Sequence, residues 1–98
     1  MSFKGQFNWI QSMRQGGRKA ISFTLTCTNL FKSETFDAAI IDGTGQQQPM
    51  LFSQLSLGAK KSFRFDMDTV GWDWCQGDTF AVVDKNGQMG KDNKWTLN

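Results

Sequence analysis

Residues 19–29, with the sequence KAISFTLTCTN, alternate apolar and polar side chains along their whole length. In an extended chain, side chains two residues apart point to the same side. One side of this segment therefore carries the apolar side chains of Ile21, Phe23, Leu25 and Cys27. The other side carries Ser22 and the threonines. The pattern predicts a β-strand that buries one face and exposes the other.

The same alternation returns at residues 61–69, with the sequence KSFRFDMDT. Here the side chains expected to face inward are Phe63, Phe65 and Met67, and those expected to face solvent are Arg64, Asp66 and Asp68. Shorter apolar runs that end in turn residues predict buried strands at 38–42 and 79–84. Further strands are expected within residues 3–9, 50–55 and 94–97, separated by glycine-containing turns.

The composition supports an all-β fold. Nine Phe and four Trp stand against a single Glu, a balance that favours strands over helices. A chain of 98 residues is long enough for one domain around one core. We therefore expect a single all-β domain over residues 1–98, built as an antiparallel β-sandwich or flattened barrel of six to seven strands.

A constant shift of 42 residues lays one half of the chain over the other. The matched segments are 16–23 with 58–65, 39–46 with 81–88, and Leu55 with Leu97. These matches predict an internal two-fold pseudo-repeat of about 42 residues, spanning approximately 8–49 and 50–98. Each half would be a three-stranded unit that buries only one face and packs against the other half. The alternative is that any two β-hairpins share alternating side chains and glycine turns.

Several chemistries are excluded by residue type. The chain has no His, which removes Ser-His and Cys-His pairs and any imidazole base. Carboxylates that cluster in the sequence, as glycoside hydrolysis would need, are Asp66, Asp68, Asp73 and Asp78. A domain of this size, however, has little room for a deep catalytic cleft. The net charge of +2 comes with scattered lysines rather than a basic stripe. We expect a non-enzymatic domain that binds no nucleic acid.

The two halves differ most in one loop. Residues 29–35 (NLFKSET) correspond to residues 71–77 (GWDWCQG), so the second copy is aromatic and acidic. In an extended segment Trp72 and Trp74 would face the same direction and form a platform. Sugars stack their C–H faces on indole rings and bind carboxylates and amides through their hydroxyls. The alternative is that both tryptophans plug the open end of the sandwich.

This loop and the turn region after the next strand are the expected ligand site. Its residues are Trp72, Asp73, Trp74, Asp78, Asp84, Asn86, Asn93 and Trp95. A small β domain with internal repeats, glycine turns and indole loops is similar to the small lectins of microbes and fungi. We therefore expect a non-enzymatic, lectin-like carbohydrate-binding module with glycans or glycoconjugates as partners. Its pseudo-symmetry would suit multivalent display, and a homo-oligomer is left open.

A second hypothesis is a protein-interaction or membrane-surface module. Trp72, Trp74 and Phe31 would then act as exposed hydrophobic anchors. Residues 14–19 carry three positive charges, and Lys60 and Lys61 occupy the equivalent turn of the second half. If both turns share one edge, that end would attract anionic lipid headgroups or an acidic partner. The alternative is that charged turns simply keep the protein soluble.

No cofactor is expected. Asp84, Asn86 and Asp92 leave a calcium site open, but their segment lacks the pattern of an EF-hand loop, and a hairpin turn is the simpler interpretation. Cys27 and Cys75 are expected to be reduced thiols, with a disulfide left open. The sequence has no apolar run of 18 residues and no apolar segment at its start, so neither a transmembrane helix nor a secretory signal is expected. The default location is the cytoplasm, with non-classical secretion left open.

Overall fold

The fold is described from a computed structural model, which covers residues 3–12, 16–83 and 89–98, with side chains excluded at 47–51 and 89–92. Seven strands and one short helix lie in this part of the chain. The strands are β1 (Phe3–Gln11), β2 (Lys19–Cys27), β3 (Glu34–Ile41), β4 (Gln47–Leu57), β5 (Ser62–Phe65), β6 (Thr79–Val83) and β7 (Met89–Thr96), and the helix is α1 (Met67–Val70).

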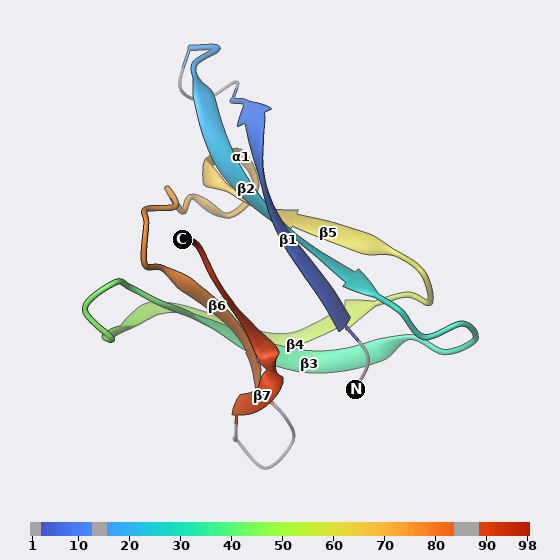
Figure 1. The fold of residues 1–98 in the computed structure, drawn as a ribbon. Coiled ribbons are helices and arrows are strands. Elements are labelled where there is room, and N and C mark those ends of the chain that lie inside the picture. The colour runs from blue at the N-terminus through green and yellow to red at the C-terminus, as the bar shows by residue number, and fades with distance from the viewer. Residues whose placement is uncertain (1–2, 13–15, 84–88) are drawn as a thin grey trace.

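The strands form two antiparallel sheets. The smaller sheet has the order β1-β2-β5, and the larger has the order β4-β3-β6-β7. The smaller sheet lies across the larger one, and the core fills the space between them (Figure 1). The expected all-β class is confirmed, and two facing antiparallel sheets are consistent with a β-sandwich.

Each sheet contains a pair of neighbouring strands from the two parts of the chain. In the smaller sheet Phe23 of β2 pairs with Phe65 of β5. In the larger sheet Ala39 of β3 pairs with Ala81 of β6. Both pairings join residues that are 42 positions apart in the sequence. The outer strands β4 and β7 continue the larger sheet on its two sides.

The antiparallel pairing of β2 with β5 separates two basic turns. The turn that precedes β2 carries Arg18 and Lys19, and the turn that precedes β5 carries Lys60 and Lys61. Because the two strands run in opposite directions, the two turns lie at opposite ends of the smaller sheet. The two turns therefore do not share one edge, and the condition for a single basic end is not met.

The core follows the alternation of β2 on one face only. Phe23, Leu25 and Cys27 are fully buried, as expected, and Ile21 is partly buried. Ser22, however, is also buried, although its side of the strand was expected to face solvent. Close to this end of β2, Asp68 of α1 accepts a hydrogen bond at 3.1 Å from Ser12, and Figure 1 shows α1 beside this end of the strand.

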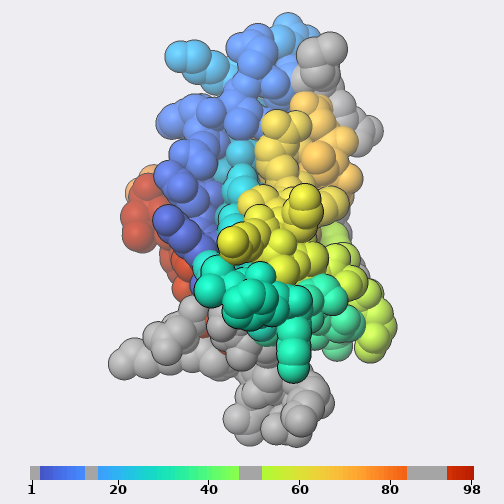
Figure 2. All heavy atoms as spheres, turned by 90° about the vertical axis from the view of Figure 1, so that its right-hand side faces the viewer, coloured from blue at the N-terminus to red at the C-terminus, as the bar shows by residue number. Residues whose placement is uncertain are grey.

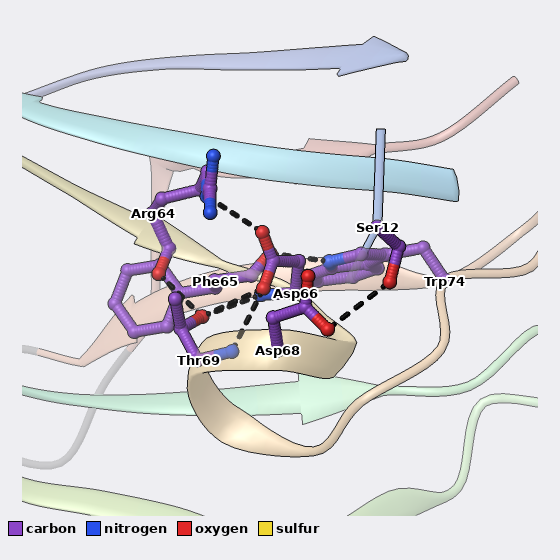
Figure 3. A network of polar contacts seen from close by, with 7 residues as sticks. All are labelled: Ser12, Arg64, Phe65, Asp66, Asp68, Thr69 and Trp74. Atoms are coloured by element: carbon purple, nitrogen blue, oxygen red, sulfur yellow. Dashed lines mark hydrogen bonds and ion pairs between the residues drawn. The ribbon is translucent and has the colours of Figure 1, made fainter. Parts of the chain in front are cut away.

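The second alternating segment stops being a strand at Phe65, where Asp66 caps a helix (Figure 3). Oδ1 of Asp66 accepts a hydrogen bond from Thr69 N at 2.8 Å, and Thr69 Oγ1 accepts one from Asp66 N at 2.9 Å. This reciprocal capping box satisfies amides that an extended chain would have to pair elsewhere. The expected strand over residues 61–69 is therefore wrong beyond Phe65.

The expectation that the charged side chains of this segment face solvent is also wrong in part. Asp66 is fully buried, and Arg64 Nε lies 2.7 Å from its Oδ2, as an ion pair without hydrogen-bond alignment. Asp68 and Met67 are half-buried in α1. Phe63 was expected to face inward, but it is 44% exposed because β5 is the edge strand of its sheet.

Replacing Asp66 by Ala should destabilise the fold by roughly 1–3 kcal/mol, because it removes the helix cap and leaves the Arg64 guanidinium without its partner. Urea unfolding followed by far-UV circular dichroism measures the change. Asp73→Ala is the matched control, because Asp73 is exposed. Equal unfolding midpoints for the two variants would contradict a structural role for Asp66.

Candidate functional site

A pocket of about 340 Å³ opens where the β1–β2 hairpin faces the end of the chain. Its lining residues are Phe7, Asn8, Trp9, Ile21, Gln76, Leu97 and Asn98. They come from two neighbouring strands of the smaller sheet, from the loop before β6 and from the residues after β7. Figure 1 shows the end marked C lying between the hairpin and that loop. The pocket is therefore built from segments distant in sequence.

The first wall is a row of side chains that continues out of the core. Phe7 packs against Phe23 and Trp74, with ring centroids 4.7 and 5.0 Å apart. Trp9 lies two residues further along β1, on the same side of the strand, and pairs with Ile21 across the ladder. Its side chain is 70% exposed. The row of β1 side chains that begins in the core thus ends with the Trp9 indole, which is exposed to solvent at the rim of the pocket.

The second wall is held in place by backbone hydrogen bonds. Gly77 N donates to Leu97 O at 2.7 Å, and Leu97 N donates to Asp78 O at 2.9 Å. Asp78 is buried, and its Oδ2 accepts a hydrogen bond from Cys75 N at 2.8 Å. These bonds fasten the loop to the chain after β7, and they place Gln76 and Leu97 opposite the hairpin.

The pocket is lined by apolar residues and by residues with amide side chains. Its apolar lining residues are Phe7, Trp9, Ile21 and Leu97, and its amide-bearing residues are Asn8, Gln76 and Asn98. The side chain of Asn8 points to the other face of β1, where it accepts a hydrogen bond from Gln6 Nε2 at 3.3 Å, so Asn8 lines the pocket through its backbone. No ionisable side chain is among the residues that line it. An amide both donates and accepts hydrogen bonds but carries no charge. The lining residues combine apolar surface with groups that can form hydrogen bonds to an uncharged polar molecule.

The expected platform of two indoles is not formed. Trp74 is only 4% exposed, and its Nε1 donates a hydrogen bond to Phe65 O at 2.8 Å. Trp72 is half-buried, and its ring meets that of Trp74 edge-on, with centroids 6.4 Å apart and planes at 81°. The assumption of an extended segment is wrong here, because residues 72–75 form an irregular loop that returns Trp74 to the core.

The other expected site residues are dispersed. Trp95 packs in the core against Phe23 and Phe80, with ring centroids 5.5 and 6.5 Å apart. Asp78 holds the loop, as described above. Asp73 is exposed and Asn93 is half-buried, and neither lines the pocket. Asp84 and Asn86 lie outside the described residues. None of the six expected residues that the structure describes lines the pocket, although their loop contributes Gln76.

Sequence reasoning missed Trp9 because it treated this residue only as part of a strand. A weak indication was available. Trp9 follows Phe7 in the alternation but lies close to the hairpin turn that contains Gly16 and Gly17, where a strand leaves the core. The partners of Trp9 could not be found, because Gln76 and Leu97 reach it only through the hydrogen bonds between the loop and the chain after β7.

Cys27 and Cys75 are free thiols, the first buried and the second exposed. Among the described residues, no three acidic or thiol side chains form a group that could hold a metal ion. Asp84 and Asn86 fall outside this part of the chain, and the side chain of Asp92 is not described, so the calcium expectation stays untested. Within the described residues no helix has the length and apolar character needed to cross a membrane.

Comparisons with protein-family models, with curated proteins and with solved structures found no match to this chain.

Replacing Trp74 by Phe should destabilise the fold by about 1–3 kcal/mol, because it leaves the buried carbonyl of Phe65 without its donor and empties part of the core. Trp9→Phe is the matched control and should change stability by less than about 0.5 kcal/mol. Urea unfolding gives both values. Acrylamide should quench Trp9 most strongly, so quenching that persists in Trp9→Phe would contradict the exposure of this indole.

Proposed function

We propose that this domain is a non-enzymatic carbohydrate-binding module that takes a neutral saccharide into the pocket beside Trp9. The observation that carries the proposal is the position of this indole, 70% exposed at a pocket whose lining residues have no charged side chain. Tryptophan is usually buried in small domains, and keeping it in solvent leaves a large apolar surface uncovered. A ligand that stacks on the ring would cover it.

The surroundings of Trp9 favour a saccharide. The C–H face of a sugar ring stacks on an indole, and its hydroxyls both donate and accept hydrogen bonds. An amide such as that of Gln76 matches this double capacity, whereas a carboxylate only accepts. A volume of about 340 Å³ lies at the small end of the range for ligand pockets. The pocket thus suits the terminal units of an uncharged glycan rather than a long buried chain.

We also infer that the chain contains an internal duplication. The pairings of Phe23 with Phe65 and of Ala39 with Ala81 support it, because a two-fold axis between two copies would bring equivalent residues together in this way. The shift of 42 residues places Phe63 over Ile21 and Glu34 over Gln76. The second copy of the pocket would therefore carry a charge where the first has an amide, which supports one saccharide site in each chain.

A glycan array tests the proposal directly. The wild-type chain should bind a subset of neutral glycans, and Trp9→Ala should weaken that binding tenfold or more, since it removes about 1.5–3 kcal/mol of apolar contact. Gln76→Ala should weaken it less. Calorimetric titration with a glycan selected on the array measures both effects.

Phe31→Ser is the matched control, because Phe31 is exposed at the other end of the smaller sheet and should leave glycan binding unchanged. A folded wild-type chain that binds no glycan on the array would refute the proposal. Full binding by Trp9→Ala would refute the placement of the site.

A further inference from the structure

A second group of exposed apolar side chains lies at the end of the smaller sheet opposite the pocket. Leu30 and Phe31, in the loop between β2 and β3, are 59% and 88% exposed. Phe63 of the edge strand β5 is also exposed, and β5 pairs with the same half of β2 that leads into the loop. Of the large apolar side chains exposed in the described chain, only Trp9 lies at the pocket. This second group needs its own explanation.

The loop holds its apolar side chains outward in a defined shape. Oδ1 of Asn29 accepts hydrogen bonds from Phe31 N and from Lys32 N, both at 3.0 Å. This side-chain turn replaces the backbone pairing that a strand would supply. Leu30 and Phe31 therefore protrude from an ordered turn.

Lysines flank this loop. Lys61 O accepts a hydrogen bond from Cys27 N at 2.9 Å, which places the turn of residues 58–61 beside the end of β2. Figure 2 shows this turn, in yellow, next to the loop between β2 and β3, in teal. Lys32 belongs to the loop itself, and Lys60 and Lys61 belong to the turn, whereas the acidic residue nearest in sequence is Glu34. We call Leu30, Phe31, Lys32, Lys60 and Lys61 the basic apolar tip.

Lys60 adds an independent observation. Its φ is +62°, in the left-handed region that favours glycine. A side chain in this region costs free energy that glycine would avoid, and such costs are found where a side chain has a function. Backbone conformation alone would thus favour glycine at position 60, where the chain instead carries a lysine.

We propose that the basic apolar tip docks on the surface of a membrane that contains anionic lipids. Leu30 and Phe31 enter the boundary between headgroups and acyl chains, and the lysine ammonium groups stay at the level of the phosphates. The tip is a protruding turn and its cations are lysines. Protein interfaces instead use Trp, Tyr and Arg in fitted pockets and are depleted in Lys, so a lipid surface matches the tip better.

Co-sedimentation with vesicles tests this proposal. The chain should bind vesicles of phosphatidylcholine with one third phosphatidylserine, and it should bind vesicles of phosphatidylcholine alone much more weakly. A Leu30→Ser, Phe31→Ser double variant should lose roughly tenfold or more in affinity. A Lys60→Gln, Lys61→Gln double variant should lose roughly fivefold for each charge and become less sensitive to added salt. Trp9→Ser, at the other end of the sheet, is the matched control and should bind as the wild type does.

Lys60→Gly separates docking from folding. It relieves the strained backbone and removes one charge, so the variant should melt at a higher temperature than the wild type and yet bind anionic vesicles roughly fivefold more weakly. A purely structural role for Lys60 would not produce this combination. Soluble glycerophosphoserine should not compete with the vesicles, because the proposal concerns a surface and not a headgroup pocket.

Equal binding to neutral and anionic vesicles, or full binding by either double variant, would overturn the proposal. The proposal would also be overturned if the chain bound neither kind of vesicle and instead bound a protein through the tip. Failure of vesicle binding can be told apart from failure of glycan binding, because the Trp9 variant changes one end of the sheet and the tip variants change the other.

Discussion

The fold depends on the contact between Phe23 of β2 and Phe80 of β6, which joins the centres of the two sheets. Both side chains are fully buried, and their rings stack with centroids 4.7 Å apart and planes at 27°. Aromatic rings from four other segments pack around Phe23, namely those of Phe7, Phe65, Trp74 and Trp95. Strand β1 can cross this cluster only because residue 5 is glycine. A Cβ there would contact Phe23 and lie 2.7 Å from Cδ2 of Trp95.

The strands could be predicted because the alternation of apolar and polar residues directly reflects which side chains are buried in the core. The alternation of residues 19–29 places Phe23 and Leu25 in the core, and β2 follows from it. The prediction was wrong where a local polar interaction competed with alternation. Asp66 and Thr69 satisfy the first amides of α1, so the chain turns into a helix although its apolar residues still alternate. Side-chain parity alone does not reveal that competition.

The pocket and the tip were harder to predict for different reasons. The pocket requires Leu97 to pair with Gly77 and Asp78, a contact that no local pattern encodes. The indoles at 72 and 74 suggested a surface platform, but Trp74 returns to the core through its bond to Phe65. At the tip, Phe31 was singled out from the sequence, whereas the separation of the two basic turns follows only from the antiparallel pairing of β2 with β5.

The length of β2 also sets a distance between the two ends of the domain. From Ile21 at the pocket to Cys27 beside the tip, the strand covers about 20 Å, at roughly 3.3 Å a residue. A chain that docks through the tip with β2 along the membrane normal would therefore hold its pocket beyond the headgroup layer. In that orientation Trp9 would meet sugars carried by an opposing surface or by solution, and it would not reach those attached to the lipids on which the domain stands. The strand would then act as a spacer that decides which molecules the pocket encounters.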